Sequence, residues 1–357
     1  MPLSHRDYTV ACICPMEVEL APVTALLDKT HPGLPTQRDQ NSYVLGEIGR
    51  HNLVIAVLPE IGTNAAATVA VQLLNDFPSI RFGLLVGIGG GVPDIEHEID
   101  IRLGDIVVSK PTKTAGGVVQ YDLGKETFKG FLRIGTLDKP PLILRAAVQQ
   151  LAARHELEDS HVPGFIAQML DKFPKMKGKY SHPGAEQDQL FETSYNHQGG
   201  ETCVRCDHSQ IISRPPRSTS NPAIHYGTIG SANRVIKNAS EREKLKSSDL
   251  DIICVEMEAA GLMDSFPCLV IRGICDYADS HKNKKWQPYA AATAAAYMKE
   301  LLSIIPMKDI VKASPATDVV QIPSEYKRTP STHWFTTCSH PIDHFHTFNN
   351  RPSLLWF

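Results

Sequence analysis

The sequence has no long apolar run. None of its hydrophobic stretches reaches the roughly 18 consecutive apolar residues that a membrane-spanning helix requires. Residues 1–8 are largely polar, so we also expect no signal peptide. These absences argue against a membrane protein or a membrane partner, and cytoplasmic residence is the default expectation.

The sequence also lacks an excess of positive charge. Its formal net charge is −3, and no block of Lys and Arg is long enough to follow a nucleic-acid backbone. Of the eight cysteines, Cys12, Cys14, Cys254 and Cys268 lie inside apolar segments. That placement is typical of free buried thiols in a reducing compartment and not of a disulfide framework. We therefore expect no nucleic-acid partner and no structural disulfides.

What the chain does have is enough apolar material for a large core. Its 357 residues are 42% hydrophobic, which suits one large domain or two ordinary ones. Apolar segments with strand character alternate with segments of helical spacing, which predicts an α/β domain with a parallel or mixed sheet. The predicted strands are Tyr8–Cys14, Asn52–Leu58, Arg81–Ile88, Ile106–Ser109 and Ile224–Ser231, and the predicted helices are Met16–Leu27, Asn64–Leu74 and Pro288–Ile305.

Two segments depart from this pattern. From Gly164 to Pro222 the periodicity fades and Pro, Gly, His and charged residues dominate, which predicts a long surface insertion. Lys308–Phe357 is rich in Thr, Ser, Pro and His without clear periodicity, which predicts a low-order C-terminal tail. The expected folded domain therefore spans residues 8–307.

The most informative stretch is Asp251–Asp279. One apolar run, Ile252–Val255, stops at an acidic segment that contains Glu258, and a second run from Cys268 ends at Asp276. In an open α/β sheet the ligand cleft lies at the carboxyl ends of the strands, so both carboxylates are expected to face one pocket. The alternative is structural, with each acid capping a helix or forming an ion pair with Arg272.

Five motifs in order resemble the nucleoside phosphorylase and nucleosidase superfamily over about residues 8–306. The pattern is most similar to methylthioadenosine/adenosylhomocysteine nucleosidases and to the N-terminal domain of fungal NACHT/NB-ARC or ankyrin-repeat proteins. The resemblance implies a three-layer α/β fold with a central mixed sheet flanked by helices. The motifs are ICPMEVEL (13–20), VGIGGGVP (86–93), GDIVVS (104–109), VEMEAAG (255–261) and VIRGICDYAD (270–279).

The resemblance also implies roles for individual residues. Asp276 matches the acid that protonates or hydrogen-bonds purine N7, and a neutral base leaves more easily than its anion. Glu19 matches the carboxylate that activates water, and Arg272 matches an arginine near that water. Glu258 matches the residue that binds the ribose hydroxyls, with Met257 packing on the sugar. The remaining residues expected to line the substrate site are Glu256, Ile88, Gly89, Gly90 and Val235. For Glu19 the alternative is a purely structural role as an exposed acid at a helix N-terminus.

The glycine-rich segment 87–91 does not match a phosphate-binding loop. It lacks the last glycine of a dinucleotide-binding turn and a following Lys-Ser/Thr pair, and it leads into Pro93. The resemblance implies a bare loop that lets backbone amides approach the ribose. Leu85 and Ile88 stand where phosphorylases of the superfamily carry an arginine and a hydroxyl. Their absence favours water over phosphate as the nucleophile.

The expected activity is therefore an N-ribosyl hydrolase that acts on adenine or other purine nucleosides or nucleotides and needs no cofactor. A purine nucleoside phosphorylase and a non-catalytic nucleoside-sensing domain stay open as alternatives. The sensor gains weight because the usual fungal arrangement continues into an NTPase module that is not recognisable here. Self-association is a further expectation, since superfamily members often complete their sites with a neighbouring subunit.

Other metal-binding and basic patterns are weaker. Cys203-x-x-Cys206 with His197 and His208 could bind zinc, but a single CxxC without a second pair favours an incidental role, so no metal is expected. Cys338, His340, His344 and His346 in the tail are weaker still. Lys282, Lys284 and Lys285 are expected to form a solvated turn, with contact to 5′-phosphates as the alternative.

Overall fold

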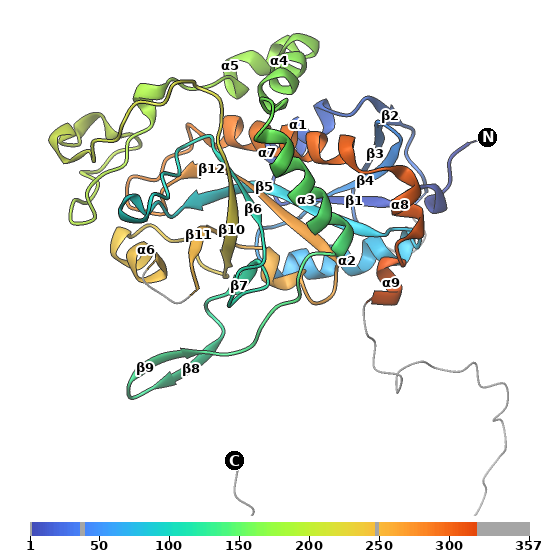
Figure 1. The fold of residues 1–357 in the computed structure, drawn as a ribbon, viewed down its shortest axis with the longest axis horizontal. Coiled ribbons are helices and arrows are strands. Elements are labelled where there is room, and N and C mark those ends of the chain that lie inside the picture. The colour runs from blue at the N-terminus through green and yellow to red at the C-terminus, as the bar shows by residue number, and fades with distance from the viewer. Residues whose placement is uncertain (1, 36–39, 247–249, 320–357) are drawn as a thin grey trace, which may run out of the picture. The chain divides into compact units, whose positions relative to one another are not determined.

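A mixed β-sheet runs through the centre of the computed structural model, which describes residues 2–35, 40–246 and 250–319. Within these residues ten strands form one sheet, in the order β11-β10-β6-β12-β5-β1-β4-β3-β2 with β7 beside β10 (Figure 1). The strands are β1 (Val10–Cys14), β2 (Lys29–His31), β3 (Tyr43–Ile48), β4 (His51–Val57), β5 (Phe82–Gly91), β6 (Ile106–Ser109), β7 (Val118–Gln120), β10 (Ile224–Ser231), β11 (Ile252–Glu256) and β12 (Cys268–Asp276). A separate hairpin joins β8 (Gly124–Thr127) to β9 (Gly130–Arg133).

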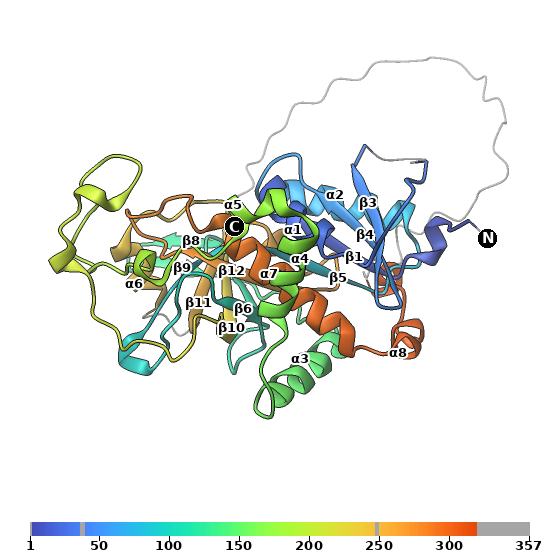
Figure 2. The same cartoon turned by 90° about the horizontal axis from the view of Figure 1, so that it is seen from above.

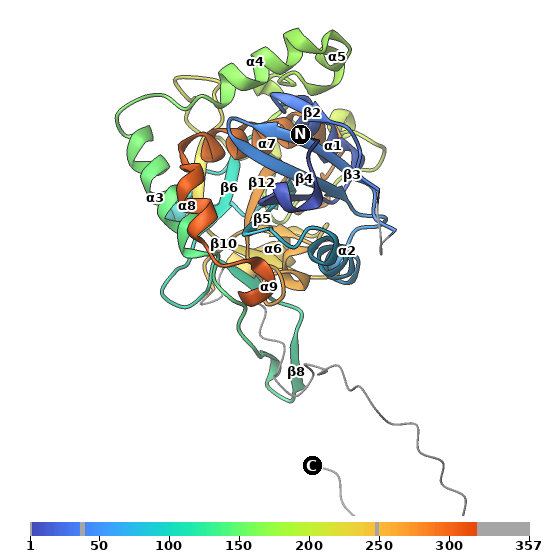
Figure 3. The same cartoon turned by 90° about the vertical axis from the view of Figure 1, so that its right-hand side faces the viewer.

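Helices cover both faces of the sheet. The helices are α1 (Glu17–Ala25), α2 (Thr63–Asp76), α3 (Leu142–His155), α4 (Val162–Lys172), α5 (Lys177–Tyr180), α6 (Ala239–Lys246), α7 (Gln287–Ile304), α8 (Met307–Lys312) and α9 (Ala316–Val319). In Figures 1 and 3, α7, α4 and α3 lie on one side of the sheet and α2 on the other. This arrangement confirms the predicted three-layer α/β fold with a central mixed sheet.

The alternation of side chains along the strands explains the two layers. In β1, Val10, Cys12 and Cys14 belong to the core under α1 and α7, whereas Ala11 and Ile13 belong to the core under α2. Successive side chains of a strand point to opposite faces, so a strand buried on both faces is apolar throughout. All five residues of β1 are buried, as this rule requires.

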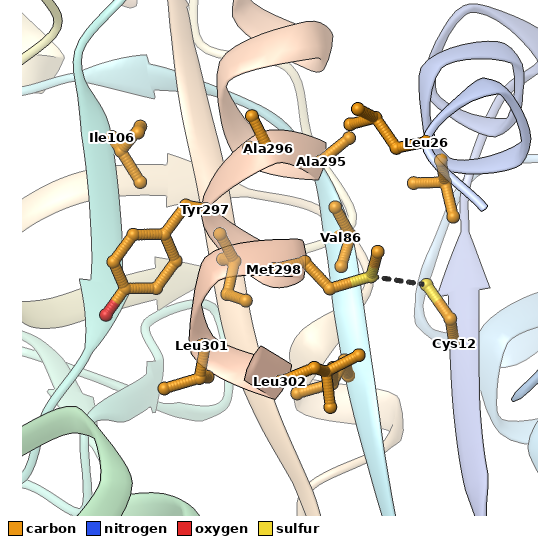
Figure 4. Close-up of a cluster of buried hydrophobic side chains, with 14 of the residues drawn as sticks. Cys12, Leu26, Val86, Ile106, Ala295, Ala296, Tyr297, Met298, Leu301 and Leu302 are labelled. Carbon is orange, nitrogen blue, oxygen red and sulfur yellow. Dashed lines mark hydrogen bonds between the residues drawn. The ribbon is translucent and has the colours of Figure 1, made fainter. Parts of the chain in front are cut away.

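Helix α7 lies unusually close to β12. A Cβ atom at Gly273 would stand 1.8 Å from the backbone oxygen of Ala290, so only glycine fits beneath the helix. The alanine-rich face of α7 allows the same close approach from the helix side. Further along, Met298 and Leu302 pack over β1 and β5, and Cys12 Sγ lies 3.8 Å from Met298 Sδ (Figure 4).

The glycines of the segment 87–91 are strand residues and not a loop, which corrects the sequence-based expectation. Strand β5 continues to Gly91, and its last residues pair with two strands at once. Gly90 is in register with Asp276 of β12 on one side and with Val255 of β11 on the other. The absence of side chains lets three strands converge at this end of the sheet.

The predicted insertion, 164–222, contains more structure than its sequence indicated. It begins within α4, includes α5, and continues through short 3₁₀ turns and extended chain to β10. Both α4 and α5 pack against α7, and Ile166, Met169 and Tyr180 join the core. Beyond α5 the segment loops out at the end of the molecule where β11 and α6 lie (Figure 2).

Ordered structure also continues past the predicted boundary at residue 307. Helices α8 and α9 follow α7, and both Ile310 and Ala316 are fully buried. These two apolar anchors hold the chain on the domain although the local sequence shows no clear period. One compact unit spans Met1–Val320, and the remainder of the predicted tail lies outside the described residues. In the described part of the chain, no helix combines the length and apolar character needed to cross a bilayer.

Candidate functional site

A cavity of about 170 Å³ lies where β5, β11 and β12 end. All ten residues predicted from sequence line it: Glu19, Ile88, Gly89, Gly90, Val235, Glu256, Met257, Glu258, Arg272 and Asp276. They come from five separate parts of the chain, and the converging strand ends bring them together. Their chemical roles stay predictions, but their shared location follows from the fold.

Arg272 is the centre of the charge cluster in this cavity. Its guanidinium is fully buried and bonds the carboxylates of Glu256 and Glu258 through Nη2, with Glu258 Oε2 at 3.0 Å. Nη1 lies 3.3 Å from the backbone oxygen of Ile88 and 3.9 Å from Glu19 Oε1. Burial alone would lower the pKa of Arg272, but the surrounding carboxylates outweigh it and the pKa is raised. Arg272 therefore remains a permanent cation.

One arginine cannot neutralise three buried carboxylates. Burial raises the pKa of Glu19 to about 8, although Arg272 and the amide of Ile88 act in the opposite direction. Burial also raises the pKa of Glu258, and the neighbouring Glu256 charge adds to this effect. At neutral pH the cluster therefore holds a proton, and Glu19 is its main site.

Two backbone amides hold the Glu19 side chain in position. Met16 N donates to Oε2 at 2.6 Å and Ile88 N donates to Oε1 at 2.7 Å. The first contact is the capping box of α1, and the second ties the helix to β5. Because only 1% of Glu19 is exposed, the alternative of a solvated helix-terminal acid is wrong.

Glu256, the last residue of β11, and Glu258, two residues beyond it, have different partners. Glu256 accepts hydrogen bonds from the amides of Glu258 and Ala259, so it caps the short turn η7 (Ala259–Gly261). Glu258 accepts from Gly62 N at 3.3 Å and from Arg272 Nη2. The structural alternative of an ion pair with Arg272 is thus present for Glu258. Its other lone pairs remain available to a ligand.

Asp276 stands at the end of β12 and makes no ion pair with Arg272. Its Oδ1 accepts from Ala278 N at 2.9 Å, and its Oδ2 lies 2.8 Å from Lys282 Nζ. Burial by itself would lower the pKa of Lys282. The Asp276 carboxylate and the neighbouring cysteines have a larger opposite effect, so the pKa of Lys282 is raised. Ala278 has a left-handed φ of 53°, which turns the chain back so that Lys282 can reach Asp276.

Lys282 is the main functional residue that sequence reasoning placed wrongly. Its side chain is only 26% exposed and lines the cavity, so it is no part of a solvated turn, whereas Lys284 and Lys285 are exposed. Gly62 and Arg234 were also missed. A weak signal existed for Lys282, because it lies only six positions after an acid at a strand end.

The glycines of β5 make room for these side chains. A Cβ at Gly87 would stand 2.4 Å from both Glu19 Oε1 and Arg272 Nη1, and one at Gly89 would meet Cys254 Sγ at 2.6 Å. A Cβ at Gly90 would lie 3.0 Å from Asp276 Oδ1. The segment therefore gives space to side chains of the cavity, and the expected approach of its backbone to a sugar stays a prediction.

A second cavity of about 620 Å³ adjoins the first. The two share Cys275, Asp276 and Lys282 as lining residues. Its outer wall comes from the insertion, including Thr202 and Cys203. A ligand that contacts Asp276 can therefore extend into a larger and more polar space.

Comparisons with known proteins agree with the fold. Residues 9–175 match the family model of the phosphorylase superfamily. A nucleotide-binding leucine-rich repeat (NLR)-like protein of Hyaloscypha variabilis is 46% identical over 307 residues. That alignment covers 85% of this chain and 30% of the relative, so the chain spans less than a third of the relative's length.

Solved structures of nucleosidases have a similar architecture. Futalosine hydrolase of Helicobacter pylori superposes with a TM-score of 0.54 at 17% identity, covering 84% of this chain and 99% of that chain. A 5′-methylthioadenosine/S-adenosylhomocysteine nucleosidase of Colwellia psychrerythraea in complex with adenine gives a TM-score of 0.53 at 18% identity, covering 85% and 98%. At these identities the likeness establishes the fold alone.

Proposed function

Because residues 9–175 of this chain match the family model of the phosphorylase superfamily, we propose that it is an N-ribosyl hydrolase for adenine or other purine nucleosides or nucleotides. One observation carries the proposal: Glu19, Glu258 and Asp276 line a single cavity from three different elements. Glycosidic cleavage by water needs a base for the water, an acid for the leaving group and a hold on the sugar. The named complexes of the similar structures, with adenine and with 5′-methylthioadenosine, support the substrate class.

Glu19 is the proposed base. Its two amide donors fix both oxygens, so the carboxylate presents a remaining lone pair to a water in the cavity. A pKa of about 8 makes it a stronger base than an ordinary glutamate once it has ionised. In the reaction Glu19 takes one proton from the water while the oxygen bonds the anomeric carbon.

Asp276 is the proposed acid. The leaving purine needs one proton, and the Lys282 ammonium lies 2.8 Å from Asp276 Oδ2. A proton passed from Lys282 through this oxygen to the purine would leave a neutral base, a neutral amine and an ionised carboxylate. Lys282 then regains a proton from solvent and Glu19 releases to solvent the proton that it took from the water, which completes the balance.

Glu258 is the proposed ribose ligand. Each of its oxygens accepts one hydrogen bond from the protein, from Gly62 N or Arg272 Nη2, and retains a lone pair for a sugar hydroxyl. Met257 lines the same wall and offers an apolar surface for the sugar ring. Binding through vicinal hydroxyls would place the anomeric carbon between the base and the acid.

The charges in the cavity favour water over phosphate. Arg272 is already shared among carboxylates and Lys282 is paired with Asp276, so Arg234 is the one further cation among the described lining residues. The backbone amide of Ile88 already donates its hydrogen bond to Glu19 and cannot bind a phosphate oxygen as well. A phosphate dianion would stand close to three carboxylates with few free donors.

The test is the dependence of base release on phosphate. Adenosine, 5′-methylthioadenosine and ATP would be incubated with the purified chain, with and without inorganic phosphate, and free base and sugar products quantified by chromatography. We expect free ribose, or its 5′-substituted form, at the same rate without phosphate. Glu19→Gln should suppress it, whereas Glu17→Gln, an exposed acid on the same helical turn, should not. Strict phosphate dependence with a ribose 1-phosphate product would establish the phosphorylase instead.

A sensor is the second candidate, and the NLR-like relative favours it. Because that relative is much longer than this chain, the domain could report nucleoside binding to other parts of such a protein. A correctly folded chain that binds adenine nucleosides in calorimetry, but releases no base from any of the three substrates, would support this function over hydrolysis.

A further inference from the structure

The insertion carries a cluster of metal-ligand side chains beside the second cavity. One ligand atom each from His197, Cys203 and Cys206 lies within 4.8 Å of the other two. His208, the other candidate from sequence, is exposed and is not part of this group. Tetrahedral zinc with bonds of roughly 2.0–2.3 Å holds its ligand atoms about 3.3–3.8 Å apart, so a small contraction would complete the site.

The local backbone suits a metal-binding turn. Cys203 and Cys206 bracket the 3₁₀ turn η5 (Cys203–Arg205), where Cys206 N donates to the oxygen of Cys203 at 3.0 Å. Such a turn points both thiols the same way, as in CxxC zinc sites. Cys206 is buried and Cys203 is partly buried, so the thiols face protein more than solvent.

A second and independent observation points to a ligand. His281 is 93% buried, and within the described residues neither of its ring nitrogens has a hydrogen-bond partner. Its ring lies 5.6 Å from that of His197, edge to face, and Cys203 Sγ lies 4.0 Å from its backbone oxygen. Phe191 stacks on the same ring at 4.0 Å and fixes its plane. The nearest charged group is the Asp279 carboxylate, whose Oδ1 lies 3.8 Å from His281 Nδ1 and so beyond hydrogen-bond distance. A buried imidazole without a hydrogen bond is unusual unless an ion binds it.

From this juxtaposition we propose that the chain binds one zinc ion through His197, Cys203 and Cys206, and that His281, which lies outside the 4.8 Å group but beside the ring of His197, moves in as the fourth ligand. Two thiolates and two imidazoles form a closed tetrahedral set, which is typical of a structural site and leaves no open position for catalysis. The proposal replaces the expectation that the CxxC motif is incidental, and it does not depend on the reaction proposed above.

The site would hold the insertion against the loop that follows β12. His197 N already donates to Ser280 Oγ at 3.0 Å, and His281 is adjacent to Lys282, the partner of Asp276. Zinc would therefore join two walls of the larger cavity that are distant in sequence. Few apolar contacts support the segment around Cys203 and Cys206, since Val204 is 85% exposed. A bound metal would therefore add stability that this segment does not obtain from a hydrophobic core.

The experiment is metal analysis of the whole chain purified under reducing conditions. Elemental mass spectrometry should find about one zinc per chain in the wild type and in two controls, His208→Gln and Cys268→Ala. Cys203→Ser and Cys206→Ser should lose it. His197→Gln and His281→Gln should weaken zinc affinity at least tenfold in a competition titration with a chromogenic chelator.

Cobalt provides a measurement that does not need a variant to fold. Co²⁺ added to the metal-depleted wild type should give the intense visible bands of a tetrahedral thiolate site, and Zn²⁺ should remove them. Wild-type protein that neither contains zinc nor takes up Zn²⁺ or Co²⁺ with reduced thiols would overturn the proposal. So would a Cys203–Cys206 disulfide in peptide mass spectra of freshly purified protein. Unchanged affinity in His281→Gln would refute its assignment as the fourth ligand.

Discussion

The carboxylate cavity and the part of the insertion that carries Cys203 and Cys206 lie side by side but are stabilised by different interactions. Most cavity residues lie at the ends of β5, β11 and β12, where register and packing fix each side chain, and Glu19 reaches them from α1. That part of the insertion consists of short turns and extended chain and has few buried apolar residues. The sheet is therefore the rigid part of the site, and the insertion is the part that needs an added constraint.

This contrast separates chemistry from enclosure. Of the residues proposed to act on the substrate, Asp276 ends β12, Glu258 follows β11, and Glu19 lies on α1 and is tied to β5, while the outer wall of the larger cavity comes from the insertion. Changes in the sheet are expected to alter the chemical step. Changes in the insertion are expected to alter what the larger cavity admits.

The largest effect is expected from Asp276→Asn. Loss of a general acid typically costs about 10²–10⁴-fold in rate, and an amide cannot pass a proton to the leaving base. Turnover of the preferred nucleoside should fall by this factor while circular dichroism and Tm stay near wild type. Asp171→Asn, at an exposed acid on α4, is the control. Wild-type turnover in folded Asp276→Asn protein would remove Asp276 from the mechanism.

A smaller loss is expected from Glu258→Ala. Charged hydrogen bonds contribute about 1.5–3 kcal/mol each, so kcat/KM should fall by roughly 10–150-fold, with KM raised and kcat lowered together. A 2′-deoxyribonucleoside should be a poorer substrate for the wild type. If the ribose and 2′-deoxyribose forms react equally and the variant matches wild type, the ribose assignment is wrong.

Two substitutions, Gly87→Ala in β5 and Gly164→Ala in α4, compare how the closely packed sheet and the surface helix tolerate an added methyl group. A Cβ at Gly87 meets Glu19 and Arg272, so we expect a loss of about 1–3 kcal/mol in the free energy of unfolding. At Gly164 nothing lies within 4 Å, so Gly164→Ala should stabilise the helix by about 0.5–1 kcal/mol. Urea denaturation measures both. Equal effects of the two substitutions would contradict the close packing described for β5.

Lys282→Met tests the proposed proton source. Removing the ammonium should lower base release by about tenfold, less than Asp276→Asn does, because solvent can still protonate the carboxylate. Lys284→Met is the matched control, since Lys284 is exposed two positions further on. A variant with unchanged turnover would show that Lys282 only neutralises Asp276.

A further comparison concerns pH and Glu19. Its pKa rises from an ordinary 4.5 to about 8 on folding, so the folded state binds the extra proton between these values. This stabilisation is complete below pH 4.5 and is lost as pH rises through about 8. The Tm of the wild type, relative to the Tm of Glu19→Gln, should therefore fall as the pH rises from about 4.5 to about 8. A constant difference from pH 5 to pH 9 would contradict the raised pKa.

Local sequence was sufficient for the main strands of the sheet and for two carboxylates of the cavity. Strands such as β6 and β10 have the predicted bounds because apolar runs and flanking turns are local properties. Strand ends that carry acids identified Glu258 and Asp276, although the reason differs from the expected parallel arrangement. The end of β11 pairs antiparallel with the end of β5, while β12 runs parallel to β5, so both acids reach the same cavity. Glu19, by contrast, was placed through the family resemblance, because nothing in its own helix shows that it is buried.

Only the tertiary structure decided the partners of these groups. Lys282 reaches Asp276 because Ala278 adopts a left-handed conformation, and His281 lies beside His197 because two distant loops meet. The same is true of α8, whose burial depends on a contact between Ile310 and the domain and not on a local period. The sequence by itself determined which faces are apolar and where charges end the strands. Long-range packing determined which charges face one another, because the energy of a buried charge depends on neighbours that adjacent residues do not specify.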